Sequence, residues 1–365
     1  MDIFSILDSA IAQGATDIHI VDGIVPTFRI KKILKRQNQM PICTPPAIAS
    51  MVDTLVKEDV NKINILKNER KLDLGFKYNG YKFRINISIS KGVYAISIRL
   101  IPNSEIDLDK YNIREIVDDM KEFASGIILV TGKVNSGKST TLNAFVQEVN
   151  KEENKKIVTL EDPIEYEHTS NKSIVLQKEV GPHSDIPTFY DGLINILRED
   201  SDIVVVGEIR DRETMDVAFD LAESGQLVIG TLHTKSCAET VDRIISLYSP
   251  QEQFSIKFIL SATLKMVSSQ KLLPSTKDGE VALVPEIMLV DNVISALIRK
   301  DKFVISDIED AIHAGQDKGC LSIETSFARM YNQGKISLNT IKQSVDRDKF
   351  EKIKQIIVRT TDGLL

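Results

Sequence analysis

The sequence of 365 residues contains no tryptophan and only three cysteines, Cys43, Cys237 and Cys320. Three cysteines so far apart cannot build a disulfide framework or a four-cysteine zinc site within one chain. No stretch approaches 18 uninterrupted apolar residues, the length that a helix needs to cross a bilayer. The opening MDIFSILDSA also lacks a basic segment followed by a long apolar one. We therefore expect no signal peptide, no membrane span and a cytoplasmic protein.

Apolar residues make up 42% of the chain and charged residues 27%, a balance that excludes disordered and low-complexity classes. The net charge of -6 is unevenly spread, since residues 1–100 carry +6 and residues 101–365 carry -12. The split fits nucleic-acid binding, packing between unlike domains of one or several subunits, or simply scattered solvated lysines. Because no basic run is interleaved with aromatic residues, we expect no nucleic-acid partner.

The length suggests about two domains. An apolar-periodic stretch predicts a helix that ends near Gly14. Runs rich in β-branched residues then predict strands over 16–21, 26–34, 81–90 and 93–100. This pattern indicates a small α+β domain over residues 1–100, followed by a polar linker over 101–112.

Beyond residue 125 short apolar runs alternate with segments of helical spacing, which predicts an α/β fold with a parallel sheet covered by helices. We assign this core to residues 113–270. The chain after residue 250 has mostly helical periodicity, for example over 258–267, 290–298 and 323–331. Residues 271–365 are therefore expected to form a helical C-terminal domain.

One motif carries clear chemistry: the run GKVNSGKS over Gly132–Ser139 matches the phosphate-binding loop G-x-x-x-x-G-K-[ST]. A strand-like run precedes it and a helix-like run follows it, which is the context that the motif requires. Its backbone amides would point at phosphate oxygens, Lys138 would reach the β- and γ-phosphates, and Ser139 would bind Mg²⁺. The predicted nucleotide-binding residues are Gly132, Asn135, Ser136, Gly137, Lys138, Ser139 and Thr140.

Acidic residues follow two other predicted strands. Glu208 ends the run DIVVVGE, where a carboxylate is placed to hold Mg²⁺ or its water; an ordinary strand-end charge is the less favoured alternative. The run TLEDPIEYE contains four acids, any of which could polarise an attacking water. They are Glu161, Asp162, Glu165 and Glu167.

Histidines give a weaker signal. His233 also follows an apolar run, but a histidine in such a place is more often structural than catalytic. The remaining four show no metal-ligand spacing, so the sequence implies no metal beyond Mg²⁺. They are His19, His168, His183 and His313.

Taken together, GIILVTGKVNSGKSTTLNA, TLEDPIEY, LREDSDIVVVGEIRDRET and AESGQLVIGTLHTKSCAETVDRI resemble the secretion ATPase family that powers type IV pili and type II secretion. GATDIHI over 14–20 and KFRINISI over 82–89 are similar to the short N-terminal domain of its pilus-retraction, twitching-motility branch. The resemblance runs from about residue 2 to the C-terminal helices. It implies a RecA-like P-loop NTPase core, a small N-terminal α+β domain of PAS-like type and a helical C-terminal region.

The resemblance also implies roles for individual residues. Lys138 and Ser139 match the Walker A residues, and Glu208 matches the Walker B acid. Glu165 matches the catalytic carboxylate, and His233 matches the second histidine of the family's His box. Two N-terminal arginines match those that reach toward the nucleotide phosphates in the family, although a solvated sheet face is an alternative for both; they are Arg84 and Arg99.

By the same resemblance the protein is a homohexameric Mg-ATPase motor for pilus retraction, with ATP and Mg²⁺ as cofactors. It would act peripherally at the cytoplasmic face of the inner membrane, on a platform protein and indirectly on pilin. The alternatives are pilus extension, type II secretion or an accessory nucleotide-binding ring. Several positions depart from the family's pattern: Gln226 replaces the first His-box histidine, Lys178 and Ser295 replace arginines, and Lys133 and Asn135 alter the loop.

Overall fold

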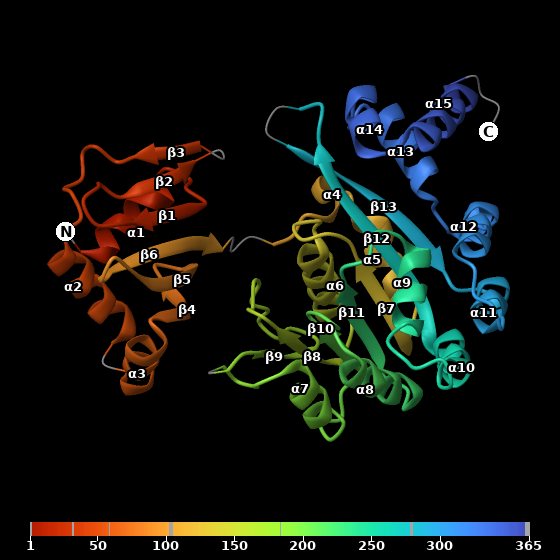
Figure 1. The fold of residues 1–365 in the computed structure, drawn as a ribbon, viewed down its shortest axis with the longest axis horizontal. Helices are drawn as coiled ribbons and strands as arrows, with labels where there is room; N and C mark the ends of the chain where they lie inside the picture. The colour runs from red at the N-terminus through yellow and green to blue at the C-terminus, as the bar shows by residue number, and fades with distance from the viewer. Residues whose placement is uncertain are drawn as a thin grey trace. The chain divides into compact units, whose positions relative to one another are not determined.

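The computed structural model describes residues 2–30, 33–57, 59–101, 105–182, 184–277 and 280–361. His183 and residues 102–104 of the expected linker lie outside the described residues. The chain divides into two compact units, Met1–Ser104 and Glu105–Leu365, each with its own sheet (Figure 1). The expected boundary near residue 100 thus falls close to the boundary between the units.

The first unit holds a six-stranded antiparallel sheet with its helices against one face. Its strand order is β3-β2-β1-β6-β5-β4 among the described residues. The elements are α1 (Ile3–Ala12), β1 (Asp17–Ile20), β2 (Thr27–Ile30), β3 (Ile33–Arg36), α2 (Pro45–Val56), α3 (Val60–Glu69), β4 (Lys71–Tyr78), β5 (Tyr81–Ser90) and β6 (Val93–Ile101).

Alternation along the strands explains the one-sided packing of this sheet. In β5, Phe83, Ile85 and Ile87 are buried, whereas Arg84 between them is exposed. Such period-two burial is typical of an antiparallel sheet with one solvated face. The expected strand over 26–34 is instead two antiparallel strands, β2 and β3.

The second unit contains a mixed seven-stranded sheet in the order β13-β12-β7-β11-β10-β8-β9 among its described residues. All neighbours are parallel except β12 and β13. The elements up to this sheet's last strand are α4 (Leu108–Tyr111), α5 (Arg114–Lys121), β7 (Gly126–Thr131), α6 (Lys138–Glu152), β8 (Lys156–Glu161), β9 (Ile174–Glu179), α7 (Phe189–Ile196), β10 (Ile203–Val206), α8 (Arg212–Glu223), β11 (Leu227–Leu232), α9 (Cys237–Ile245), α10 (Gln253–Thr263), β12 (Leu264–Pro274) and β13 (Val281–Leu289).

Helices cover both faces of this sheet (Figure 1). Ile127 and Leu129 of β7 belong to the apolar cluster formed with α7 to α10, while Ile128 and Val130 belong to the cluster formed with α5 and α6. Every residue of β7 is therefore buried. Burial on both faces is the reason that these strands read as continuous apolar runs in the sequence.

The helical region begins later than the sequence indicates. The expected helix over 258–267 is confirmed only up to Thr263, where α10 ends, and is wrong beyond it, because β12 begins at Leu264. Residue 270 therefore lies inside a strand of the core sheet rather than at a domain boundary. A buried strand lacks the alternation that would distinguish it from a helix, so periodicity failed here. The helices after the sheet are α11 (Asn292–Arg299), α12 (Ile305–Ala314), α13 (Ile323–Asn332), α14 (Leu338–Ser344) and α15 (Arg347–Thr361).

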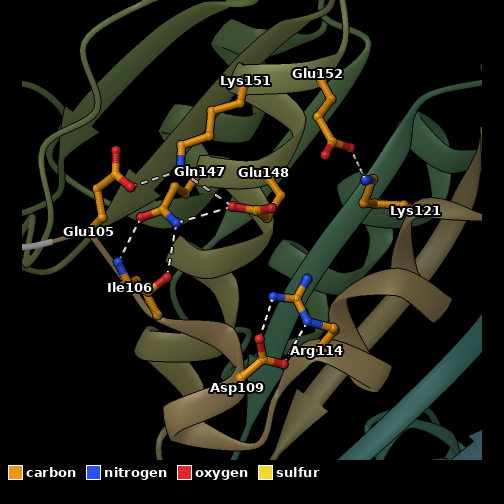
Figure 2. A network of polar contacts seen from close by, with 9 residues as sticks. All are labelled: Glu105, Ile106, Asp109, Arg114, Lys121, Gln147, Glu148, Lys151 and Glu152. Atoms are coloured by element: carbon orange, nitrogen blue, oxygen red, sulfur yellow. Dashed lines mark hydrogen bonds and ion pairs between the residues drawn. The ribbon is translucent and has the colours of Figure 1, made fainter.

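Part of the expected linker is hydrogen-bonded to helix α6 of the second unit. Figure 2 shows the Gln147 side chain of α6 paired with the Ile106 backbone, accepting from its N–H at 2.8 Å and donating to its carbonyl at 3.0 Å. Arg114 binds Asp109 through two hydrogen bonds of 2.6 and 2.8 Å. Residues 105–121 thus belong structurally to the second unit.

Candidate active site

The predicted site residues of the second unit follow four neighbouring strands of the parallel sheet. The phosphate-binding loop follows β7, His233 follows β11, Glu208 follows β10, and the segment with Glu165 follows β8. These strands are adjacent in the order β7-β11-β10-β8. Because their carboxyl ends meet at one edge, segments far apart in sequence line one cleft of about 520 Å³.

The phosphate-binding loop packs closely against β12. A Cβ atom at Gly132, where φ is +141°, would lie 2.5 Å from the Gln270 carbonyl oxygen and 2.5 Å from Ser136 Oγ. Gly137 has φ +94° and immediately precedes α6, so the chain turns there in a conformation that favours glycine. The two motif glycines are therefore required by the turn and by its contact with β12.

Lys138 lies across the loop that it belongs to. Its Nζ donates hydrogen bonds to the Gly132 carbonyl at 2.9 Å and to the Lys133 carbonyl at 3.1 Å. Burial lowers the pKa of Lys138, and the charge of Glu208 partly offsets this shift. Lys138, the first residue of α6, thus places its ammonium group within the loop. The N-terminus of α6 lies at the same place and also favours anions.

Glu208 is held by two side chains. Its Oε1 lies 3.1 Å from His233 Nε2, and its Oε2 accepts a 2.7 Å hydrogen bond from Arg210. Burial alone would raise the pKa of Glu208, but Arg210 and His233 outweigh it and keep the pKa below the usual value. Glu208 is consequently an ionised carboxylate at the edge of the cleft, suited to a cation or its water shell.

The segment after β8 presents two carboxylates of different character. Glu161 is buried, and burial raises its pKa against the opposing hydrogen bonds of Thr159, Gln177 and Asn143. Glu165 is exposed and lines the cleft. Of the four acids that the sequence left open, Asp162 and Glu165 both line the cleft and are exposed to water, and the match to the family's motif favours Glu165 between them.

The cleft has the features that an Mg-nucleotide needs. Ser136 Oγ is buried and finds no hydrogen-bond partner among the described residues, while Ser139 and Thr140 begin α6 beside it. The cradle at Gly132 leaves no room for a side chain, and the donors and cation of the loop face the carboxylate of Glu208. The donor set fits phosphate oxygens, and a hydroxyl beside a carboxylate fits Mg²⁺.

Arg84 and Arg99 lie in the first unit, whereas the residues that line the cleft all belong to the second. The two arginines are directly opposite each other on β5 and β6. Arg99 also donates to Asp17 at 3.0 Å. The structure therefore brings the arginines together on one sheet face, and their part in nucleotide chemistry stays a prediction.

Sequence reasoning missed several residues of the site. Arg210 stands two residues after Glu208 in GEIRD, a spacing that would have suggested the ion pair. Gln270 reaches the loop from β12, where its Nε2 donates to Thr141 Oγ1 at 2.8 Å. Asn143 contacts His168, and Gln177 donates to the Tyr166 carbonyl, both in the segment after β8, and no local pattern marks either Asn143 or Gln177.

Three of the departures from the family's pattern, at Gln226, Lys178 and Ser295, lie away from the cleft, whereas Asn135 of the loop lines it. Gln226 immediately precedes β11, at the end of that strand opposite the cleft, where its carbonyl accepts from Gly126 N at 3.0 Å. Lys178 binds Glu199 and Asn195. Ser295 of α11 donates to the Ser261 carbonyl at 3.0 Å. The last two substitutions act between structural elements rather than on the nucleotide pocket.

Comparisons with known proteins agree with this geometry. The type II/IV secretion system protein family matches residues 2–346. A type IV pilus retraction ATPase, PilT, of Pseudomonas aeruginosa is 36% identical over 92% of this chain and 96% of its own length. A twitching motility protein of Neisseria gonorrhoeae is 33% identical over 92% of this chain and 88% of its own.

The crystal structure of a pilus retraction motor, PilT, with bound ADP superposes with a TM-score of 0.88 at 32% identity, covering 96% of this chain and 99% of that one. The α/β fold with a RecA-like core, expected from the sequence, is thereby confirmed. The resemblance found in the motifs is confirmed over almost the whole chain, and the protein belongs to the type II/IV secretion ATPase family.

Proposed function

We propose that the protein is an ATP-hydrolysing motor that retracts a type IV pilus. One observation carries the proposal: a phosphate cradle, an ionised strand-end carboxylate and an exposed second carboxylate line one cleft at adjacent strand ends. These are the parts that phosphoryl transfer to water requires. The relatives described as a retraction ATPase and as a twitching motility protein each match 92% of this chain. This similarity favours retraction over extension or secretion.

The chain's own groups have separate tasks in this mechanism. The loop amides and Lys138 hold the β- and γ-phosphates and stabilise negative charge that develops on the transferred group. Ser139 and Glu208 would hold Mg²⁺, which neutralises phosphate charge when bound. The Arg210 and His233 contacts fix the carboxylate of Glu208 in the orientation that this task needs.

Glu165 is the proposed base. It would accept a hydrogen bond from water and orient that water in line with the γ-phosphorus. The water oxygen would bond to the γ-phosphorus as the bond to the β–γ bridging oxygen breaks, so that ADP leaves, inorganic phosphate forms and the water proton passes to the carboxylate. Its place on a loop after β8 sets it at the cleft without burying it. Glu161 also lines the cleft but is buried, so it is less suited to meet water directly.

We further propose that six copies form a ring in which Arg84 and Arg99 reach the nucleotide phosphates and move with the first unit. The excess of positive charge in residues 1–100 over the acidic remainder supports packing between unlike parts of the chains. The ring would act on a platform protein at the cytoplasmic face of the inner membrane and so withdraw pilin. No described helix is long and apolar enough to cross a membrane.

The first experiment measures Mg-ATP turnover of the purified protein beside Glu165→Ala and Glu208→Ala. We expect turnover by the wild type and a loss of about 10²-fold or more in each variant, because each substitution removes a group that acts on the transition state. Binding of ADP without hydrolysis by the wild type would favour the accessory ring instead.

Direction is tested in cells. A strain that lacks a retraction motor accumulates surface pili, whereas a strain that lacks an extension motor has none. We expect deletion of this chain to leave more pili than the parent strain carries. Loss of pili would overturn retraction in favour of extension, while leaving the ATPase assignment intact.

A further inference from the structure

A polar network links the segment that carries Glu165 to the helix of the phosphate-binding loop. Asn143 of α6 is 4% exposed, and its Nδ2 donates to the Ser139 carbonyl at 2.9 Å. His168, three residues after Glu165, places its Nε2 2.8 Å from Asn143 Oδ1. One side chain therefore contacts both the proposed Mg²⁺ residue Ser139 and the end of the Glu165 segment.

The proton in the histidine contact is assigned by its neighbours. An amide side chain donates only through nitrogen, and Asn143 uses that nitrogen toward Ser139, so Asn143 Oδ1 is an acceptor. His168 must then carry a hydrogen on Nε2 to make the 2.8 Å bond. His168 is therefore the donor and Asn143 the acceptor. A residue that replaces His168 must place an N–H at a similar distance from Asn143 Oδ1.

Gln177 of β9 closes the network from the other side. Its Oε1 accepts from the His168 backbone N–H at 2.8 Å, and its Nε2 donates to the Tyr166 carbonyl at 2.7 Å and to Glu161 Oε1 at 2.9 Å. The backbone on the C-terminal side of Glu165 is thus bound at two positions, by one side chain anchored in the sheet.

We propose that His168 is a positioning residue that, through Asn143 and Gln177, holds the Glu165 segment at a fixed place relative to Ser139. The inference rests on the proposed function, in which Glu165 orients water and Ser139 binds Mg²⁺. A general base misplaced by about 1 Å can lose 10²-fold in rate, so a short loop gains from such anchoring. His168 itself touches no reacting atom.

This role predicts a split between binding and catalysis. His168→Ala removes the donor to Asn143 without altering the phosphate cradle, so we expect kcat to fall about tenfold or more. KM for ATP and the Kd for ADP should stay within about twofold. His168→Gln can place an N–H near the position of Nε2 and should restore most of the lost kcat. Gln177→Ala should reproduce the split, because it releases the same backbone.

A matched control is Gln226→Ala. It removes a glutamine side chain at the strand end opposite the cleft in the same sheet. We expect kcat to remain within about twofold of wild type. Hydrogen exchange of the amides between 162 and 168 gives a readout independent of turnover. We expect faster exchange there in His168→Ala and Gln177→Ala, with unchanged exchange in the control.

Three results would overturn the proposal. The first is a folded His168→Ala protein with kcat within twofold of wild type. The second is equal inactivity of His168→Ala and His168→Gln, since the hydrogen bond would then not be the cause. The third is unchanged exchange of the segment in both network variants. If wild type binds ADP but hydrolyses no ATP, the proposed function fails, and the exchange measurement alone decides the positioning role.

Discussion

The first and second units bury their sheets in different ways. This difference decides at which positions a functional residue can be recognised from the sequence. The antiparallel sheet of the first unit packs helices against one face and exposes the other, so Arg84 and Arg99 lie within strands and are still exposed. The parallel sheet of the second unit is buried on both faces. Its chemically active side chains can reach solvent only where strands end.

In a sheet that is buried on both faces, a polar residue at the end of a strand indicates a functional site. In a sheet with one solvated face, an exposed polar residue does not, because any side chain on that face is exposed. Glu208 and His233 both follow fully buried strands and both reach the cleft. Arg84 alternates with buried residues, as any solvated side chain of that sheet would. The following substitutions test this contrast, in order of decreasing effect.

Lys138→Ala should have the largest effect, a fall in kcat/KM of about 10³-fold. The variant loses the cation that lies inside the loop, while Lys133→Ala removes an exposed lysine of the same loop and should change kcat/KM by less than about threefold. Steady-state ATP hydrolysis measures both. Equal losses in the two variants would show that net loop charge matters more than position.

Arg84→Ala tests the one-sided sheet. If Arg84 reaches nucleotide phosphate in the ring, turnover should fall about 10²-fold. Thermal stability should change by less than about 0.5 kcal/mol, because Arg84 is exposed and lies opposite the like charge of Arg99. Turnover and thermal unfolding on the same preparation separate the two effects. Unchanged turnover would leave Arg84 a solvated residue and sharpen the contrast between the sheets.

Asp119 of α5 offers a smaller effect on stability. Burial and the nearby charges of Glu115, Asp118 and Glu122 raise its pKa to about 6 from 3.8. The unfolded chain therefore releases this proton at lower pH than the folded one, and the free energy of unfolding falls as pH rises from about 4 to 6.

Asp119→Asn should remove that loss and stabilise the second unit above pH 6 by about 1 kcal/mol, a value reduced because the side chain is only half-buried. The gain should vanish below about pH 4. Denaturant unfolding across this range measures it, with Asp220→Asn on the exposed face of α8 as control. A gain that does not depend on pH would contradict the electrostatic explanation.

The smallest effect is expected for Gln226→His, which restores the family's first His-box histidine. Gln226 lies at the edge of the sheet opposite the cleft, so kcat should change by less than about twofold. Steady-state turnover is again the measurement. A larger change would mean that this opposite edge contributes to catalysis and would break the rule drawn from strand ends.

Most of the candidate site could be predicted because its parts obey local rules. The motif around Lys138 lies between a strand and a helix. Glu208 and Glu165 each come after a parallel strand that the apolar runs of the sequence predict. The network of Asn143, His168 and Gln177 could not be predicted, since its members come from a helix, a loop and another strand with no fixed spacing. Its hydrogen bonds exist only because β8 and β9 pair in parallel beside α6.

The sequence by itself determined the α/β class, the phosphate-binding loop and the family, because local periodicity and short motifs record backbone geometry directly. The tertiary structure alone decided that Leu264–Pro274 and Val281–Leu289 join the core sheet and that Glu105 and Ile106 bind α6. It also decided that Asp162 and Glu165 meet the cleft as exposed carboxylates while Glu161 is buried. These outcomes depend on packing between distant segments, for which burial on both faces and long-range hydrogen bonds leave no local pattern.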